Sequence, residues 1–461
     1  MQLWCLALLP VALAACHTAP MATTRNVTYT GRYLAEFSEE LFLGIPLARA
    51  GRLKSPAPLN ESWQGSRSAE QYGAICPCPA SNKCVRNANV TGKSDGCLDL
   101  NIIRPSLATL KSRTAKLPDA VWLYGGGFAD GFGADLTSNF LWVVQASVAQ
   151  GMPIMAVTFN YRTGFPGFPG GEEVAAAGVT NLGLKDQRQA VRWAMLCGQS
   201  VGANSIIYQL LAYGGRGGEE KLFRGAIMSS GLHRHRQQHT PDQVFAASQA
   251  TTTQPTWWPT IDGDFLTTPP TLQLQAGLFP RDVSILKGTN SDDGFALTNA
   301  PTPLIPTGNM STERLRPNPR PGRRALSLNS PLSAACRRRT RYTYRFDTYL
   351  TRPTSSPMDP TLEQQSGFVA GHSAEYADCF RFRSRAHRAL SGVISGMLVA
   401  FTPMCPPGPP KYSVESPSNL VLDATMVPDA LHIHVEPDTW REEGMALWAE
   451  YPLELDLGVE W

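Results

Sequence analysis

The 461-residue chain has almost no excess of charge of either sign. Lys and Arg total 41 and Asp and Glu total 38, so the net charge is only +3. Nucleic-acid-binding domains ordinarily carry a strong basic patch or stripe. The balance therefore argues against nucleic acid as a partner. A phosphate-binding loop is also absent at the glycine cluster near residue 126. There Asp130 stands where G-x-G-x-x-G requires its last glycine, and no GK[ST] follows.

Long apolar runs are missing after the N-terminus, so we expect no stable membrane span. The first residues, MQLWCLALLPVALAAC, are apolar, short and rich in small residues at their end, which is typical of a secretory signal over 1–19. No Lys or Arg precedes this run, and Leu13 to Cys16 also fits a bacterial lipid-attachment site. Four N-x-S/T sequons favour glycosylated export, and they lie at Asn26, Asn60, Asn89 and Asn309. We expect a secreted, extracellular glycoprotein.

No standard zinc spacing occurs among the cysteines. The chain has ten cysteines, which fits an oxidising compartment. Four crowd together as Cys76, Cys78, Cys84 and Cys97, and their spacing, C-x-C-x5-C-x12-C, differs from that of structural zinc sites. The pattern favours a disulfide over a metal site at these cysteines.

Apolar β-rich runs alternate with helix-forming runs along most of the chain. Strands are predicted over 120–124, 153–162, 225–229, 283–290 and 341–350, and a helix from Ser200 that closes at glycines. Helix formers also fill NLGLKDQRQAVRWAM, residues 181–195. This alternation predicts an α/β protein with a mostly parallel central sheet and flanking helices. We assign one domain to residues 20–461, with no internal repeat.

Residues 301–339 differ in composition from the rest of this domain. They are rich in Pro and Arg, have few large apolar residues and show no period of 2 or 3.6. Nine arginines and no acid lie between Arg314 and Arg341. We interpret 301–339 as a disordered Arg/Pro-rich insert. A basic interaction arm and a stretch foreign to the ancestral fold are the alternatives.

Ser200 lies at the centre of a G-x-S-x-G pattern in MLCGQSVGAN. Small residues on both sides let the backbone turn tightly and expose the hydroxyl, as a nucleophilic serine requires. The glycines of YGGGF, residues 124–128, follow a predicted strand and leave backbone N–H groups accessible to a developing oxyanion. A nucleophile and oxyanion donors are two of the three parts that a serine hydrolase needs.

An acid and then a histidine should follow the serine in this class. GTNSDDG offers Asp292 and Asp293 on a loop after a strand. Four histidines follow that loop, and His372, beside a glycine in AGHSAEYADCF, is the best placed general base. His432 and His434 lie in ALHIHVE, an alternating run in which we expect both to face solvent.

With these pieces in order, the chain resembles the type-B carboxylesterase/lipase family, the group that includes cholinesterases. The resemblance rests on motifs in family order: LFLGIPLA, LNESW, GCLDLNIIRP, VWLYGGGF, FNYRTGFPGFPG, NLGLKDQRQAVRWA, GQSVGANS, LFRGAIMSSG, IDGDF and KGTNSDDG. It is good over 27–231, fair over 258–300 and thin beyond. It implies an α/β-hydrolase fold and hydrolysis of carboxylic esters, with a small-molecule or lipid ester as partner and no metal or cofactor.

The resemblance also implies roles for individual residues. Ser200 fills the nucleophile position, His372 the base position and Asp293 the position of the acid, which is usually Glu in the family. Gly126 and Gly127 match the oxyanion glycines, and Val201 supplies a third N–H where the family usually has Ala. Cys97 matches the first family disulfide, with Cys76 or Cys78 as its partner.

The chain departs from the family pattern in three regions. Only Ala194 to Cys197 stand where the family has a helix end, a loop and a strand before the serine. The cap between SSG and IDGDF is reduced to 232–260, and the Arg/Pro segment replaces helical structure. The turn at Ser200 needs a preceding strand, and Trp193 to Cys197 can supply one if the helix ends by Arg192.

We therefore predict a secreted serine esterase or lipase that acts through an acyl-enzyme with a Ser200–His372–Asp293 triad. The alternative is a catalytically impaired or dead family member, either one that serves adhesion or partner binding or one that results from a defective gene model. The sequence assigns no oligomeric state.

Overall fold

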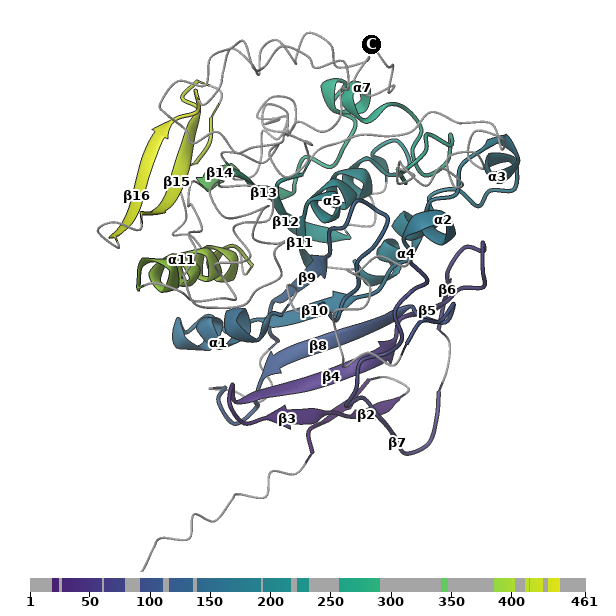
Figure 1. The fold of residues 1–461 in the computed structure, drawn as a ribbon, viewed down its shortest axis with the longest axis horizontal. Coiled ribbons are helices and arrows are strands. Elements are labelled where there is room, and N and C mark those ends of the chain that lie inside the picture. Colours follow the sequence, from purple (N-terminus) through teal and green to yellow (C-terminus); the bar gives the residue numbers. More distant parts are fainter. Residues whose placement is uncertain are drawn as a thin grey trace, which may run out of the picture.

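The main feature of the protein is one large, mostly parallel sheet (Figure 1). A computed structural model describes residues 19–24, 27–59, 62–78, 92–110, 116–135, 139–191, 194–216, 222–231, 257–290, 341–346, 385–402, 411–413, 415–425 and 430–439. The large sheet has 11 strands in the order β16-β15-β14-β13-β12-β11-β9-β10-β8-β4-β3. Its strands are β3 (Arg32–Leu34), β4 (Glu39–Pro46), β8 (Asp99–Pro105), β9 (Asp119–Leu123), β10 (Met155–Phe159), β11 (Ala194–Gln199), β12 (Phe223–Ser229), β13 (Ser284–Asn290), β14 (Arg341–Phe346), β15 (Ser418–Thr425) and β16 (Ala430–Pro437).

The central strands run parallel and the margins run antiparallel. Neighbours from β10 through β9, β11, β12, β13 and β14 to β15 are parallel. β8, β4 and β3 at one margin and β16 at the other pair antiparallel. Two small sheets complete the described strands, one of β1 (Met21–Thr23), β2 (Thr28–Thr30) and β7 (Ser66–Ser68), the other of β5 (Ala48–Arg49) and β6 (Ala57–Pro58). This arrangement confirms the predicted α/β class.

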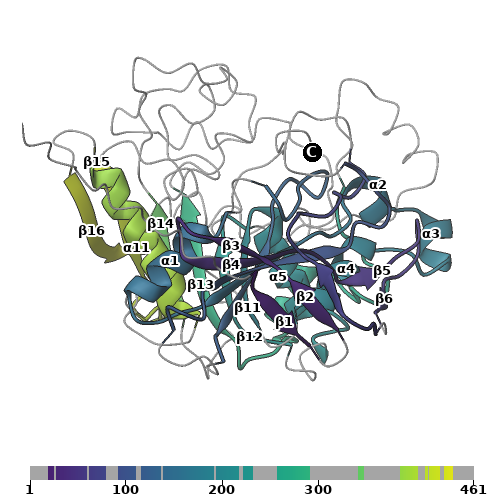
Figure 2. The same cartoon turned by 90° about the horizontal axis from the view of Figure 1, so that it is seen from below.

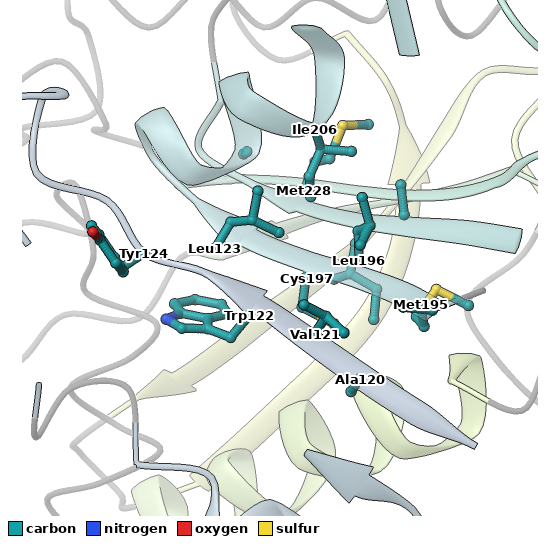
Figure 3. Close-up of a cluster of buried hydrophobic side chains, with 14 of the residues drawn as sticks. Ala120, Val121, Trp122, Leu123, Tyr124, Met195, Leu196, Cys197, Ile206 and Met228 are labelled. Atoms are coloured by element: carbon teal, nitrogen blue, oxygen red, sulfur yellow. The ribbon is translucent and has the colours of Figure 1, made fainter. Parts of the chain in front are cut away.

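Helices cover the two faces of the large sheet. They are α1 (Leu141–Ala149), α2 (Gly164–Gly167), α3 (Glu172–Ala176), α4 (Leu182–Ala190), α5 (Val201–Leu211), α7 (Pro270–Gln275) and α11 (Arg385–Phe401). Met228, Lys287 and Thr343 are aligned across β12, β13 and β14, so their side chains share a face. Figure 3 shows Met228 beside Ile206 of α5 on that face. Tyr342, the neighbour of Thr343, points the other way and its ring contacts Phe401 of α11, with centroids 6.0 Å apart. α5 and α11 therefore lie on opposite faces.

The hydrophobic core lies where β9, β11 and β12 meet α5 (Figure 3). All six residues of β11 are buried, and Met195 and Leu196 have no exposed surface. A parallel strand buried on both faces needs such a continuous apolar run. The edges of the sheet lie far from this core, and the β15–β16 hairpin and α3 stand at opposite ends of the molecule (Figure 2).

The structure corrects one expectation about secondary structure. The run 181–195 is not helical throughout, because α4 ends at Ala190 and Ala194–Gln199 forms β11. As a strand, this segment pairs with both β9 and β12 and buries all six of its side chains, which a longer helix would not do. The predicted strand before Ser200 is thus present among the described residues. Three expected features lie outside the described residues: the insert over 301–339, the signal up to residue 18, and the part of the shortened cap over 232–256.

Candidate active site

Ser200 occupies a sharp turn between a strand and a helix. β11 ends at Gln199 and α5 begins at Val201, so Ser200 is the only residue between them. Its φ of 56° and ψ of −128° lie in a region that a residue with a Cβ rarely adopts and that costs of the order of 1–3 kcal/mol. Two backbone bonds hold it there, from the Ser200 N–H to the Ser229 carbonyl at 2.9 Å and from the Asn204 N–H to the Ser200 carbonyl at 3.0 Å. The neighbouring strand β12 and the helix thus impose the strained geometry.

Two glycines let the helix start close to the strand. A Cβ on Gly198 would lie 2.5 Å from the backbone carbon of Gly202, and a Cβ on Gly202 would lie 2.0 Å from the carbonyl oxygen of Leu123. Both distances are shorter than van der Waals contact, so only glycine fits at either position. The flanking glycines of G-x-S-x-G are therefore required by the approach of α5 to β9 and β11.

The glycine loop after β9 lies against Ser200. A Cβ built on Gly125 would be 3.1 Å from the Cβ of Ser200. Gly126 and Gly127 have φ values of +118° and +66°. Among the described residues, the N–H groups of Gly126, Gly127 and Val201 donate no hydrogen bond. Gly125 thus places the glycine loop next to the serine, at a helix N-terminus where the peptide dipoles favour negative charge.

Two tyrosines fix the glycine loop to the end of β10. The rings of Tyr124 and Tyr161 stack with centroids 4.0 Å apart. The Tyr124 hydroxyl donates to the Tyr161 carbonyl at 2.6 Å and accepts from the Tyr161 N–H at 3.0 Å, and the Tyr161 hydroxyl donates to the Tyr124 carbonyl at 2.7 Å. Burial raises the pKa of both phenols above the ordinary value, so neither ionises near neutral pH. This pair is a neutral positioning device, and the sequence analysis did not identify it.

A buried ion pair fixes the segment that follows β10. Arg162 donates from Nε and Nη2 to the two carboxylate oxygens of Asp186 in α4, at 2.7 Å each, and its backbone N–H bonds the same carboxylate at 3.1 Å. The Nη1 atom of Arg162 donates to the Lys54 carbonyl at 2.8 Å. Both ions are almost fully buried, and a bidentate geometry of this kind is the strong form of an ion pair. The pair therefore anchors α4 to the segment that follows β10.

Aromatic side chains surround the glycine loop. Phe128 is fully buried, and its ring lies 4.6 Å from that of Phe168 and 5.6 Å from that of Trp258 between centroids. The Phe128 carbonyl accepts a hydrogen bond from the Gly164 N–H at 2.6 Å, which joins the loop to α2. Apolar surroundings strengthen a hydrogen bond to developing charge because they exclude water. The only sequence signal for Trp258 was its place in TWWPT just before IDGDF.

Several predicted site residues lie outside the part of the chain that the structure describes. Asp293 and His372, the predicted acid and base, lie outside the described residues, as do Asn26, Asn60, Asn89 and Asn309. Among the predicted site residues, Ser200 and Val201 are adjacent at the start of α5, and Gly125, the residue before Gly126 and Gly127, lies against Ser200.

The cysteine pattern gives a defined disulfide. Cys76 and Cys97 are bonded, which selects Cys76 from the two partners expected for Cys97. Cys78 is in a disulfide as well. Cys197 in β11 is free and buried, and burial raises the pKa of its thiol far above the ordinary value. A thiol in that state is not a nucleophile.

Metal and membrane features can be assessed within the described ranges. No three or more His, Cys, Asp or Glu side chains of these ranges converge on a point that could hold a metal ion. None of the described helices is both long enough and apolar enough to cross a bilayer.

Comparisons with known proteins find relatives among carboxylesterases and lipases. A model of the carboxylesterase family matches residues 19–254. Lipase 1 of Geotrichum candidum is 33% identical over 234 residues, which are 42% of this chain and 41% of the lipase. Secreted lipase 1 of Botryotinia fuckeliana is 34% identical over 249 residues, 46% of this chain and 42% of that protein. An inactive carboxylesterase-like protein, VdtD of Byssochlamys spectabilis, is 33% identical over 222 residues, 44% of this chain and 36% of VdtD. The chain spans less than half the length of these curated relatives.

Solved structures show the same fold over nearly the whole chain. A thermophilic PNB esterase superposes with a TM-score of 0.70 at 21% identity, covering 93% of this chain and 100% of its own. EstA of Aspergillus niger superposes with a TM-score of 0.69 at 22% identity, covering 95% and 99%. The predicted α/β-hydrolase fold is confirmed by these similarities.

Proposed function

The chain belongs to the carboxylesterase family, and on that premise we propose that it is a secreted serine hydrolase of carboxylic esters. The observation that carries the proposal is the strained turn at Ser200, which faces the glycine loop through Gly125. Strain of this kind persists only where the surrounding structure enforces it, and it is concentrated at functional sites. The substrates would be small-molecule or lipid esters, and the chemistry needs no cofactor.

The proposed reaction starts with attack of the Ser200 Oγ on the ester carbonyl carbon. His372 takes the serine proton and then gives it to the leaving alkoxide, while Asp293 orients the imidazole and stabilises its charged form. The N–H groups of Gly126, Gly127 and Val201 donate to the oxyanion of the tetrahedral intermediate. Water, activated by the same histidine, then hydrolyses the acyl-enzyme and releases the acid.

The turn positions the Ser200 hydroxyl and the Val201 N–H before substrate binds. The glycines at 198 and 202 let α5 begin directly after the strand, so the hydroxyl and the Val201 N–H stand on one rigid element. The Tyr124–Tyr161 pair holds the start of the glycine loop, and the Arg162–Asp186 pair holds the segment after β10. Preorganised donors of this type cost no reorganisation when charge develops, which is the main source of stabilisation in acyl transfer.

The test is hydrolysis of p-nitrophenyl esters by the full chain, secreted with its own signal. Ser200→Ala is compared with Ser66→Ala, which removes a hydroxyl from an exposed position in β7. We expect Ser200→Ala to lower kcat/KM about 10⁴-fold or more and Ser66→Ala to leave it unchanged. Equal rates for wild type and Ser200→Ala would remove Ser200 from the mechanism.

A second candidate is a member with little or no turnover, and one observation favours it. The relative VdtD is named as inactive, although it is about as similar to this chain as the named lipases. Labelling with a fluorophosphonate separates the two candidates because it needs a reactive serine but no turnover. A chain that is labelled at Ser200 and hydrolyses no ester would be this second kind of protein.

A further inference from the structure

The outer strand of the large sheet carries two exposed histidines. β16 is the last strand of the sheet, and it forms the β15–β16 hairpin at the margin of the molecule (Figure 1). Both His432 and His434 are exposed, as expected, and 54% of the His434 side chain is accessible to solvent. Ile433 and Val435 on the other face of the strand are exposed as well. The proposed esterase chemistry uses neither residue.

The two imidazoles are on the same face of the hairpin. Residues two apart in a strand point the same way, so His432, His434 and Glu436 share a face. The strand register places His434 opposite Val421, and Val421 opposite Arg345 of β14. This is the face that α5 covers further along the sheet, whereas α11 packs on the other face. Both imidazoles can therefore turn toward a common point without displacing a helix.

The spacing of the pair suits a single ion. Alternate residues of an antiparallel strand lie about 6.8 Å apart. Two imidazoles that lean toward each other from that spacing can each reach the distance of about 2.0–2.1 Å at which ring nitrogens bind Zn²⁺. The strand fixes the backbone of both residues, so only side-chain rotation is needed.

A fixed carboxylate adds negative charge at one end of the pair. An Oε2 atom of Glu436 is 3.8 Å from the Nε2 atom of His434. The other oxygen of Glu436 accepts from Arg345, whose Nε and Nη2 atoms are 3.0 Å and 2.9 Å away. Because Arg345 is buried and holds this carboxylate in place, Glu436 is oriented before any ion arrives. Outer carboxylates that hydrogen-bond or polarise ligating histidines increase metal affinity.

We propose that His432 and His434 form a two-histidine site for a divalent transition-metal ion on β16. Imidazole ligands select Zn²⁺, Cu²⁺ and Ni²⁺ over Mg²⁺ and Ca²⁺, which prefer oxygen. Water fills the remaining coordination positions, since no third His, Cys, Asp or Glu of the described residues converges there. By the order of stabilities for these ions, Cu²⁺ binds tighter than Ni²⁺ or Zn²⁺.

The test uses the full chain, purified without a polyhistidine tag, and Cu²⁺ as the probe. A second His-x-His pair, His233 and His235, is present in the sequence and would bind the same ion. The matched background is therefore a His233→Gln/His235→Gln variant. In this background we expect one tight Cu²⁺ equivalent with an electron paramagnetic resonance spectrum of two imidazole nitrogens.

Single variants in that background assign the ligands. His432→Gln and His434→Gln should each weaken Cu²⁺ binding about tenfold or more and leave one coupled nitrogen. Unchanged circular dichroism shows that the exposed substitutions preserve the fold. Binding in the double variant His432→Gln/His434→Gln that equals its background would overturn the proposal. A background protein whose bound Cu²⁺ couples to fewer than two nitrogens would overturn it without any further substitution.

Discussion

At the scale of single residues, the fold holds Ser200 in a rare backbone conformation and Lys287 in a buried environment, both of which are energetically unfavourable. Ser200 keeps a positive φ because β12 and α5 bond its backbone on both sides. Lys287 lies in β13 with 7% of its surface exposed, and its Nζ atom makes no hydrogen bond within the described part of the chain. The proposed chemistry rests on the first state, whereas the second lowers the stability of the fold.

Burial lowers the pKa of Lys287 from 10.5 to about 7, and the carboxylate of Asp438 opposes this shift only in part. The unfolded chain therefore binds a proton between pH 7 and 10.5 that the folded protein lacks. Stability therefore rises with pH between 7 and 10.5, because the unfolded state binds more protons in this window. Below pH 7 the folded state must also carry the buried charge, so the amine then destabilises the fold by its full amount.

We predict that Lys287→Met stabilises the protein at pH 7, where the buried amine costs most, and has little effect near pH 10.5. The wild-type free energy of unfolding should rise with pH across this window by up to about 1.4 kcal/mol per unit, and the variant should lack that rise. Denaturant unfolding at pH 7, 8 and 9 measures both slopes. Parallel pH profiles for the two proteins would show that the amine is solvated in the folded state.

At the scale of secondary-structure elements, α4 and β11 show how packing overrides local preference. Residues 181–195 contain helix formers throughout, yet the helix ends at Ala190 and the chain enters the sheet at Ala194. The central position between β9 and β12 buries every side chain of β11. The Arg162–Asp186 pair then fixes α4 against the segment after β10.

We predict that Asp186→Asn destabilises the protein by about 3–5 kcal/mol, because it leaves the buried Arg162 charge without its partner. Asp95→Asn is the matched control, since it breaks an exposed pair with Arg52 at 2.8 Å, and it should cost no more than about 1 kcal/mol. Thermal and denaturant unfolding compare the two. A similar loss for both variants would mean that burial does not set the strength of the inner pair.

At the scale of the whole molecule, contacts between distant parts of the chain set the fold. The sheet order places β9 between β11 and β10 and brings β14 beside β13, although these strands are far apart in sequence. Outside the large sheet, the Cys76–Cys97 disulfide closes a loop of 21 residues near the start of β8. Such a bond persists in oxidising compartments, in agreement with the secretion that we propose.

We predict that the double variant Cys76→Ser/Cys97→Ser loses about 3 kcal/mol of stability, as expected for a loop of this length. Guanidinium unfolding of the secreted protein measures the loss. Reduced wild type should be at least as unstable as the variant, because reduction also opens the bond at Cys78. An unchanged unfolding midpoint in the double variant would show that this bond adds nothing to the fold.

Much of the fold and part of the site were predictable from local pattern. The strands that end near Leu123, Phe159 and Ser229 are apolar runs flanked by turn residues, and each appears close to its expected position. The turn at Ser200 followed from the glycines on either side. The Tyr124–Tyr161 pair and Trp258 were not predictable, because their partners come from segments that only the folded sheet brings together.

The sequence by itself determined the family and the order of the motifs, and it singled out the serine that we propose as nucleophile, since these depend on residue types at fixed spacing. It also predicted that His432 and His434 share one face of a strand, although both faces of β16 are exposed because the strand lies at the edge of the sheet. Only the tertiary structure decided that Ala194–Gln199 is a strand rather than the end of a helix. Short apolar segments fit either state, and the hydrogen bonds and burial offered by β9 and β12 decide between them.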